Sequence, residues 1–474
     1  MRVSFHFSEN GRIAGAKALA KNKTVCALAS SNYWSCTENS SNNSWNVNFN
    51  NGNANNNNKY NTNVVRAVAA LADDEIQSWI DAYDACCRNK RTSTQCSIYR
   101  VKHEEDLLLL AAEVKLRTYT QGPSDAFCVK HPKVREIFAA GFRDRVAQHW
   151  IVSRLEPMFE ELFIEAGDVS YNCRKGYGTL AAINEQKENI EKISENWTRE
   201  AWVGSGDISA FFMSICTELM SSKLDAFIIE RYRGDDIEDL RWLTNVIISH
   251  EPQHNCVRKG DTSLWNALPA KKSLFGSEKY RGMPIGNITT QQTANFFMTE
   301  FDGWAVKEVK SFDGAYIRFV DDIRVVAQNK EDISAFFRKA KSRLSERLKL
   351  TIHPSKRYLQ PVRHGDLFVG AVIKPHRTYI SNRTRGRMEW VFSKMENFCE
   401  EITHRGLRQS DIATLEHYCS SVNSYMGFLI HHNTYAIRAK LFLNLVFFWR
   451  YYTVENRFIK VKLKKKIYDK VVFI

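Results

Sequence analysis

The sequence predicts a mixed α+β fold with two or three subdomains, and three observations lead to this prediction. At 474 residues, 44% of them hydrophobic, the chain is long enough to bury a sizeable core and to form more than one subdomain. Apolar residues recur with helical spacing over much of the chain, whereas β-forming residues flank the adjacent aspartates Asp321 and Asp322. Residues 376–474 are basic and carry few strand patterns.

The expected elements follow from apolar spacing. Ile76, Trp79, Ile80 and Tyr83 lie at i, i+3, i+4 and i+7, which predicts a helix that begins near residue 73. Further helices are expected from 107, over 144–164 and over 333–348. Strands are expected at 201–208, 316–327 and 367–373.

The first 72 residues differ from the rest of the chain in composition. Between Asn32 and Asn63, 15 of 32 residues are Asn. Asn competes with the backbone for hydrogen bonds and is unfavourable inside helices. Composition alone therefore favours an irregular, flexible and poorly ordered leader.

Charge and cysteine usage limit the function classes. The chain holds 67 Lys and Arg against 53 Asp and Glu, a net charge of +14, which favours a polyanionic partner such as nucleic acid. Its cysteines form no C-x-x-C pair, which argues against a zinc ribbon or a disulfide framework. The sequence shows no signal-peptide core and no membrane-spanning apolar stretch. We therefore expect a cytoplasmic protein with no membrane partner.

Carboxylates at two places predict metal chemistry. Asp321 and Asp322 lie between two β-forming runs, which predicts a hairpin with the acidic pair at its tip. Burying two adjacent carboxylates is costly unless a cation is present, although a solvated turn is an alternative. Asp207 follows a second short strand pattern. A polymerase uses such carboxylates to hold two Mg²⁺ ions, about 3.5–4 Å apart, that activate a 3′-hydroxyl and clamp a triphosphate.

These residues resemble motifs of reverse transcriptases. Phe319-Val320-Asp321-Asp322 resembles the family's Y/F-x-D-D box, and Asp207 matches the aspartate of its first palm motif. The resemblance implies catalysis by Asp207, Asp321 and Asp322, with two Mg²⁺ ions bound at Asp207, Ile208, Asp321 and Asp322. It also makes Phe212 the aromatic gate against a ribose 2′-hydroxyl, although Phe212 or the adjacent Phe211 can equally be a core residue.

Further segments resemble the family's other motifs in the same order along the chain: 127–137 in the fingers, 282–287 in the palm, 350–356, and the primer grip at 365–370. Lys130 and Arg135 of the first segment can also be ordinary solvated charges. The resemblance implies nucleotide binding by Lys130, Arg135, Phe212, Ile285, Gly286, Gln291 and Lys356, and primer or template binding by Gly282, Pro284, Asn287, Gly370, Arg438 and Lys440.

Within this family, several segments resemble the reverse transcriptases of diversity-generating retroelements. These segments are 135–146, 173–179 and the run from Ile285 to Gln291, in which Thr290 replaces an expected Ser. Retron and group II intron enzymes share parts of these patterns. The implied fold is a right-hand polymerase: an Asn-rich leader at 1–72, fingers at 73–200, a palm with an antiparallel sheet at 201–375, and a basic helical thumb at 376–474.

The subgroup resemblance also implies a task for the enzyme. Such an enzyme copies a template-repeat RNA into cDNA with errors at adenine, and Asn codons tolerate replacement of their adenines without becoming stop codons. The leader therefore resembles translated template DNA, or the variable end of a lectin-like target. The implied partners are structured template RNA, cDNA, dNTPs and a small basic accessory protein. The alternatives are a retron-like or defence-associated enzyme that makes fixed cDNA, and an inactive palm that only holds RNA.

Overall fold

The computed structural model describes residues 71–469 apart from 89, 92, 131 and 132, together with four short strands before residue 71. The chain divides into two compact units. The first unit comprises Met1–Asp168, Ile208–Gly303 and Lys341–Ile352, and the second comprises Val169–Asp207, Trp304–Ala340 and His353–Ile474. Both contain helices and strands, so the predicted mixed fold is confirmed.

The prediction of an irregular leader is wrong for part of residues 1–72. Strands β1 (Cys26–Ala29), β2 (Asn32–Glu38), β3 (Asn43–Asn48) and β4 (Asn53–Asn58) form an antiparallel sheet in that order. In the sequence of β3, Trp45 and Val47 alternate with polar residues, and this period of two favours a strand in spite of the Asn content. The other residues before 71 lie outside the described part of the chain.

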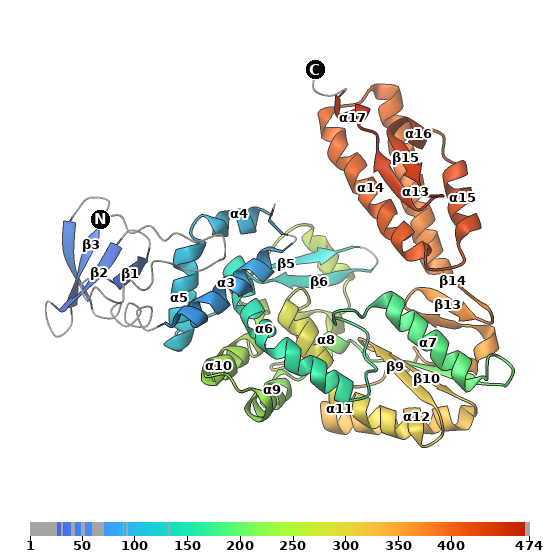
Figure 1. Ribbon diagram of the computed structural model, residues 1–474, viewed down its shortest axis with the longest axis horizontal. Helices are drawn as coiled ribbons and strands as arrows, with labels where there is room; N and C mark the ends of the chain where they lie inside the picture. Colours follow the sequence, from blue (N-terminus) through green and yellow to red (C-terminus); the bar gives the residue numbers. More distant parts are fainter. Residues whose placement is uncertain are drawn as a thin grey trace. The chain divides into compact units, whose positions relative to one another are not determined.

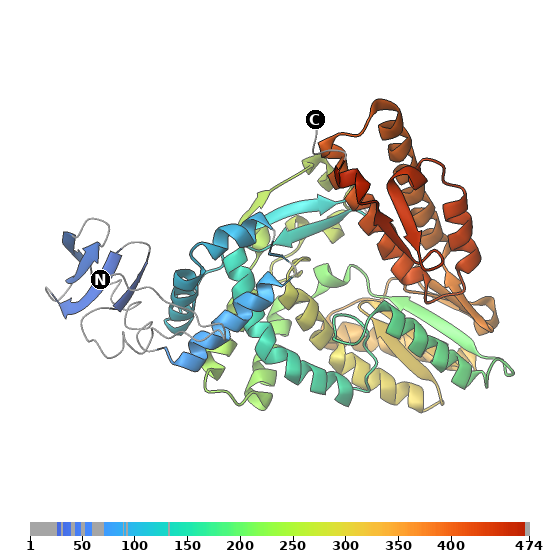
Figure 2. The ribbon, with the colours of Figure 1, turned by 45° about the horizontal axis from the view of Figure 1, so that its top comes forward.

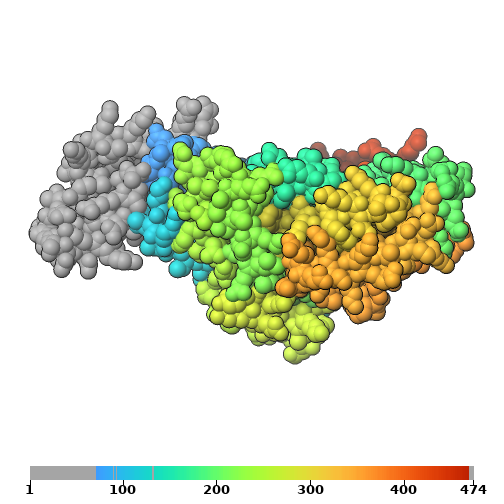
Figure 3. All heavy atoms as spheres, turned by 90° about the horizontal axis from the view of Figure 1, so that it is seen from below, coloured from blue at the N-terminus to red at the C-terminus, as the bar shows by residue number. Residues whose placement is uncertain are grey.

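The first unit is mainly helical, and the helices predicted from residues 73, 107 and 144 are confirmed. They are α3 (Asp73–Cys87), α5 (His103–Lys115) and α6 (Phe142–Glu165), and α4 (Thr94–Arg100) lies between the first two. The rings of Trp79 and Trp150 stack with their centroids 4.8 Å apart, which joins α3 to α6 through two buried side chains. Helices α9 (Thr217–Arg231) and α10 (Ile237–Ile248) lie on the face seen in Figure 3, in light green.

A small sheet in the first unit contains the 127–137 segment. Strands β5 (Ser124–Val129) and β6 (Arg135–Ala139) form an antiparallel hairpin, and β8 (Cys256–Arg258) pairs parallel to β5. Short helix α8 (Phe211–Ser214) and the start of α11 (Ile288–Lys310) also belong to this unit.

The second unit is built on an antiparallel sheet with the strand order β11-β7-β10-β9. These strands are β7 (Trp202–Asp207), β9 (Ala315–Phe319), β10 (Asp322–Ala327) and β11 (Tyr358–Pro361). Helices α7 (Thr179–Ile193) and α12 (Lys330–Arg343) lie on opposite sides of β9 and β10 (Figure 1). Apolar residues of α7 share one buried cluster with Val203 and Val326 of the sheet.

Two glycines let α12 approach the other face of β7. A Cβ at Gly204 would lie 2.3 Å from Cγ2 of Ile333, and one at Gly206 would lie 2.6 Å from Cε1 of Phe337. Because Gly204 and Gly206 have no side chains, α12 can pack closely against β7 immediately before Asp207.

The C-terminal part of the second unit begins with a second sheet. Strands β12 (Asp366–Phe368), β13 (Ala371–Lys374) and β14 (Arg377–Ile380) are antiparallel neighbours, so this sheet continues past residue 376. Long helices α13 (Asn382–Arg405) and α14 (Gln409–Leu429) follow and run side by side (Figure 2). They enclose an apolar core with α15 (Tyr435–Leu443), α16 (Phe448–Tyr451) and the hairpin β15 (Tyr452–Glu455)–β16 (Lys460–Leu463), before α17 (Lys466–Asp469).

No helix within the described residues is long and apolar enough to cross a lipid bilayer.

Candidate active site

The structure brings the three predicted aspartates together at one end of the β11-β7-β10-β9 sheet. Asp207 ends β7 and is the register partner of Asp322, the first residue of β10. Asp322 also pairs with Phe319 of β9, so Val320 and Asp321 form a two-residue turn. The predicted hairpin with an acidic tip is thus confirmed. Directly opposed residues of antiparallel strands present their side chains on the same face.

The turn holds a strained residue beside the carboxylates. Val320 has φ 59°, in the left-handed region that β-branched residues rarely adopt. Such a conformation costs about 1–3 kcal/mol and persists only where the surrounding structure enforces it. Here the paired strands on both sides enforce it.

Burial and electrostatic repulsion both disfavour a negative charge at the acidic tip. Burial, and next the negative charge of Asp207, raise the pKa of Asp321 to about 6, while the nearby Lys356 opposes this rise. Nζ of Lys356 lies 2.7 Å from Oδ1 of Asp207. The lysine predicted to bind nucleotide therefore neutralises part of the acidic site in this structure.

The donor set fits Mg²⁺. Across the described residues, no three His, Cys, Asp or Glu side chains are arranged as a ready-made metal site. Mg²⁺ commonly takes only one or two protein carboxylates and completes its octahedron with waters and substrate phosphates. Asp207 and Asp321 supply such a pair, and their mutual repulsion would be relieved by a cation.

A buried arginine contacts the site, and the sequence analysis missed it. Arg324 of β10 is 3% exposed and donates to the Asp322 carboxylate, to Ser205 Oγ (2.7 Å) and to Asp366 Oδ1 (3.2 Å). Asp366 is fully buried and also accepts from Nε2 of Gln186 (2.7 Å). The available signal was a charged residue inside the apolar strand Ile323–Ala327, because a buried Arg requires an acidic partner.

The loop at 282–287, for which the sequence predicts a palm motif, is hydrogen-bonded to β6 and to the residue after it, within the first unit. The Phe138 amide donates to the Ile285 carbonyl (2.9 Å), and the Ala140 amide donates to Oδ1 of the buried Asn287 (3.3 Å). Gly286 has φ 128°, and a Cβ there would lie 2.9 Å from the Phe138 carbonyl oxygen. A close approach of two backbones therefore requires this glycine.

The other predicted residues of the first unit differ in exposure. Phe211 is buried and Phe212 is partly exposed, so Phe212 is the ring of this pair that can present a face to a ligand. Arg135 is exposed at the start of β6, and Lys130 is a solvated charge 3.3 Å from Asp261. Three more occupy the same unit: Gly282 (φ 95°), whose amide donates to the Ile215 carbonyl, Pro284, which is partly exposed, and Gln291, which is exposed.

In the second unit, Gly370 (φ 94°) lies in the turn between β12 and β13, where its carbonyl accepts from Thr384 Oγ1 (3.2 Å). Lys440 is exposed on α15. Arg438 differs from the expectation that it contacts primer and template. It is 7% exposed and donates to the carbonyls of Arg457 (3.3 Å) and Phe458 (3.0 Å), so it anchors the turn of the β15–β16 hairpin.

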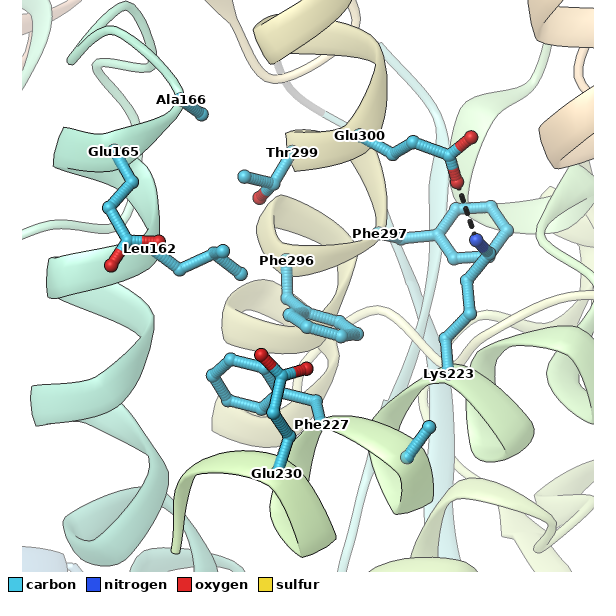
Figure 4. Close-up of a pocket in the computed structure, with 11 residues that line it drawn as sticks. Leu162, Glu165, Ala166, Lys223, Phe227, Glu230, Phe296, Phe297, Thr299 and Glu300 are labelled. Carbon is cyan, nitrogen blue, oxygen red and sulfur yellow. Dashed lines mark hydrogen bonds and ion pairs between the residues drawn. The ribbon is translucent and has the colours of Figure 1, made fainter.

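A groove of about 440 Å³ lies between α6, α9 and α11 of the first unit. Leu162, Phe227 and Phe296 line it, and Lys223 pairs with Glu300 (2.6 Å) at its edge (Figure 4). Its lining contains none of the residues for which the sequence predicts a role.

One family model matches the part of the chain that contains this site. Residues 129–363 match the family described as Reverse transcriptase (RNA-dependent DNA polymerase), a range that includes Asp207, Asp321, Asp322 and Lys356. No curated protein matches the chain.

Solved structures of telomerase are similar at low identity. Apo telomerase from Candida tropicalis is 10% identical over 66% of this chain and 62% of its own (TM-score 0.38), and a form truncated from its C-terminal domain is 11% identical over 55% and 56% (TM-score 0.38). Telomerase from Candida albicans, in complex with a TWJ fragment of telomeric RNA, is 9% identical over 68% and 56% (TM-score 0.37). The chain thus spans 56–62% of the length of these telomerase chains. On the family match, the chain contains a reverse transcriptase domain, the domain of an RNA-directed DNA polymerase, at residues 129–363.

Proposed function

We propose that the chain is an RNA-directed DNA polymerase whose reaction takes place at Asp207 and Asp321. The observation that carries this proposal is the register of the sheet, which sets Asp207 opposite Asp322 and leaves Asp321 at the tip of the hairpin, inside the reverse transcriptase domain. Reverse transcriptase domains generally use divalent metal ions, typically Mg²⁺.

Each residue of the site has a task in this proposal. Asp207 and Asp321 would hold two Mg²⁺ ions through their carboxylate oxygens. Bound there, the ions would supply activation of the primer 3′-hydroxyl and stabilisation of charge on the attacking and leaving oxygens. Lys356 exchanges its contact with Asp207 for one with the incoming dNTP. On the sequence motifs alone, we also propose that Arg135 binds the triphosphate and that Phe212 restricts the sugar.

The test is extension of a primed RNA template with Mg²⁺ present. Asp321→Asn keeps the size of the side chain and removes its charge, so we expect a loss of several orders of magnitude in rate. The matched control is Asp313→Asn, an exposed residue (φ 54°) in the turn before β9, where Asn is tolerated. Near-normal polymerisation by Asp321→Asn contradicts the proposal.

We further propose that the enzyme is a right-hand polymerase of the diversity-generating subgroup, with fingers at 73–200, a palm at 201–375 and a thumb at 376–474. It would copy a template-repeat RNA into cDNA with errors at adenine. The sequence patterns at 135–146, 173–179 and 285–291 support this assignment. The genomic test is a near-identical repeat of the DNA that encodes residues 32–68, differing at adenines, at the end of a nearby gene. Absence of that repeat favours an enzyme that makes fixed cDNA.

A small basic accessory protein is part of the same proposal. Its attachment to a chain of net charge +14 requires bridging RNA or acidic surface groups. Acidic residues are present in the first turns of α3 (Asp73, Asp74, Glu75) and α5 (Glu104, Glu105, Asp106). We expect purified enzyme alone to prime promiscuously or to be poorly processive, and full template-repeat cDNA made without a partner counts against this.

A further inference from the structure

Arg324 is a buried cation whose position is fixed from three strands. Its Nη1 donates to Ser205 Oγ of β7 (2.7 Å), its Nε to Asp366 Oδ1 of β12 (3.2 Å), and its Nη2 to the Leu367 carbonyl (2.7 Å). Nη1 also donates to the carboxylate of Asp322, two residues earlier in β10. Since residues i and i+2 of a strand face the same way, Asp322 and Arg324 share one face of the sheet.

The other contacts of Arg324 fix its position independently of Asp322. Asp366 is fully buried and accepts from Nε2 of Gln186 on α7 (2.7 Å) and from the Tyr358 hydroxyl. The guanidinium also lies 4.9 Å from the ring centroid of Phe368. A buried ion pair with this many hydrogen bonds is costly to break, because either partner alone would be an uncompensated charge. Arg324 therefore cannot follow Asp322 if that carboxylate turns toward a metal ion.

Asp322 is thereby set apart from the other two aspartates. One of its carboxylate oxygens is bonded to a cation that the protein fixes, and its side chain is 30% exposed. A divalent ion on this carboxylate would lie close to the buried guanidinium, and the two positive charges would repel each other. Asp207 differs because its cationic partner, Lys356, is 46% exposed and carried on a flexible side chain that can move away.

We propose that Arg324 is a positioning residue that keeps the Asp322 carboxylate bound to the protein, so that the catalytic metal ions rest on Asp207 and Asp321. The assignment rests on the proposed polymerase function and deepens it. It makes Asp322 a structural anchor of the turn rather than a metal ligand, in contrast to the implication of the sequence motif.

The first test measures metal binding without catalysis. Mn²⁺ is titrated into the full chain, and free Mn²⁺ is followed by electron paramagnetic resonance. We expect Asp321→Asn to weaken Mn²⁺ affinity about tenfold or more. Asp322→Asn should change it by less than about threefold, because the amide oxygen still accepts from Arg324. Equal weakening in both variants overturns only the proposed role of Arg324 and leaves the proposed polymerase function standing. An unchanged affinity in Asp321→Asn overturns the metal site, and with it both proposals.

The second test releases Asp322. Arg324→Met combined with Asp366→Leu removes both charges of the buried pair, so that the Asp322 carboxylate is the one group that loses its partner. We expect the freed Asp322 to tighten Mn²⁺ binding about tenfold, and added Asp322→Asn to reverse the gain. The matched control is Arg154→Met with Asp236→Leu, which removes a shielded ion pair (2.7 Å) of the first unit. Unchanged or weaker binding after release overturns the proposal, and if the released variant fails to fold the first test still decides.

Discussion

At the scale of one residue, the charge of the Asp321 carboxylate lowers the stability of the folded state. Burial and the charge of Asp207 raise its pKa from 3.8 to about 6. The folded state then holds the proton more tightly than the unfolded state, so stability present at low pH is lost as the pH rises between these values.

Asp321→Asn should therefore stabilise the metal-free protein at pH 7, by about 1–3 kcal/mol once partial exposure is allowed for. The measurement is denaturant unfolding in EDTA at pH 4.5 and pH 7, with Asp313→Asn as the control. The difference from wild type should be small at the lower pH and larger at the higher one. An equal difference at both pH values would show that Asp321 does not titrate in this window.

In the proposed diversity-generating function, Ile285 is the residue that we expect to lower fidelity, although its chemistry does not single out adenine. Its side chain is partly buried against the cluster that contains Phe138, Met213 and Leu274, and its backbone is bonded to β6. Most reverse transcriptases carry Gln at the matching position, and an amide can restrain a base pair by hydrogen bonds that an aliphatic side chain cannot make.

We expect Ile285→Gln to lower misincorporation opposite adenine about ten- to a hundredfold, which corresponds to about 1–3 kcal/mol of discrimination. The measurement is sequencing of cDNA made on an adenine-rich RNA template, with Ile285→Leu as the apolar control. An unchanged error rate with intact polymerisation would mean that Ile285 is only a packing residue, and Arg135 would be the next to change.

At the scale of elements, the glycines of β7 fix the distance between this strand and α12. Gly204→Ala would place a methyl group 2.3 Å from Cγ2 of Ile333. That atom is attached to a stiff β-branched Cβ, so the helix has to move. We expect a loss of about 1–3 kcal/mol of stability and a clear loss of polymerase rate, since Asp207 lies three residues later in the same strand.

The matched control is Gly386→Ala in α13, where an added Cβ meets nothing within 4 Å. Replacing a helix glycine by Ala should be neutral or stabilise by about 0.5–1 kcal/mol. Thermal unfolding and primer extension of both variants measure the effect. Equal stability in the two variants would show that α12 accommodates the methyl group without cost.

At the scale of the whole molecule, the net charge of +14 should govern RNA affinity. In the basic tail, Lys462 is paired with Glu455 (2.8 Å), whereas Lys465 and Lys466 are exposed around the start of α17. We expect Lys465→Ala with Lys466→Ala to weaken RNA binding and to lower the slope of log affinity against log salt by about one per lost phosphate contact.

Lys307→Ala with Lys310→Ala removes the same charge from the end of α11 and serves as the control. Filter binding across a series of salt concentrations measures both. If the two pairs change the slope equally, the tail acts only through net charge and makes no contacts of its own.

The sequence by itself determined the strands and the tight turn that bear Asp207, Asp321 and Asp322. A strand, a tight turn and a strand are local patterns, and the residues around Asp207, Asp321 and Asp322 carry them within a few positions. Helices with strong apolar periodicity, such as α3 and α6, could be predicted for the same reason. The sheet within the Asn-rich leader was missed because composition outweighed a short alternation of Trp45 and Val47 with Asn.

Only the tertiary structure decided which charges meet. Arg324 and Asp366 are 42 residues apart in sequence, and Lys356 and Asp207 are 149 apart, so no spacing rule links them. Arg438 reads in sequence as a surface cation, yet it is buried because the turn at Arg457 and Phe458 offers carbonyls to its guanidinium. Burial depends on what the rest of the chain brings to a residue, and this is why the anchoring of Asp322 emerges only from the folded sheet.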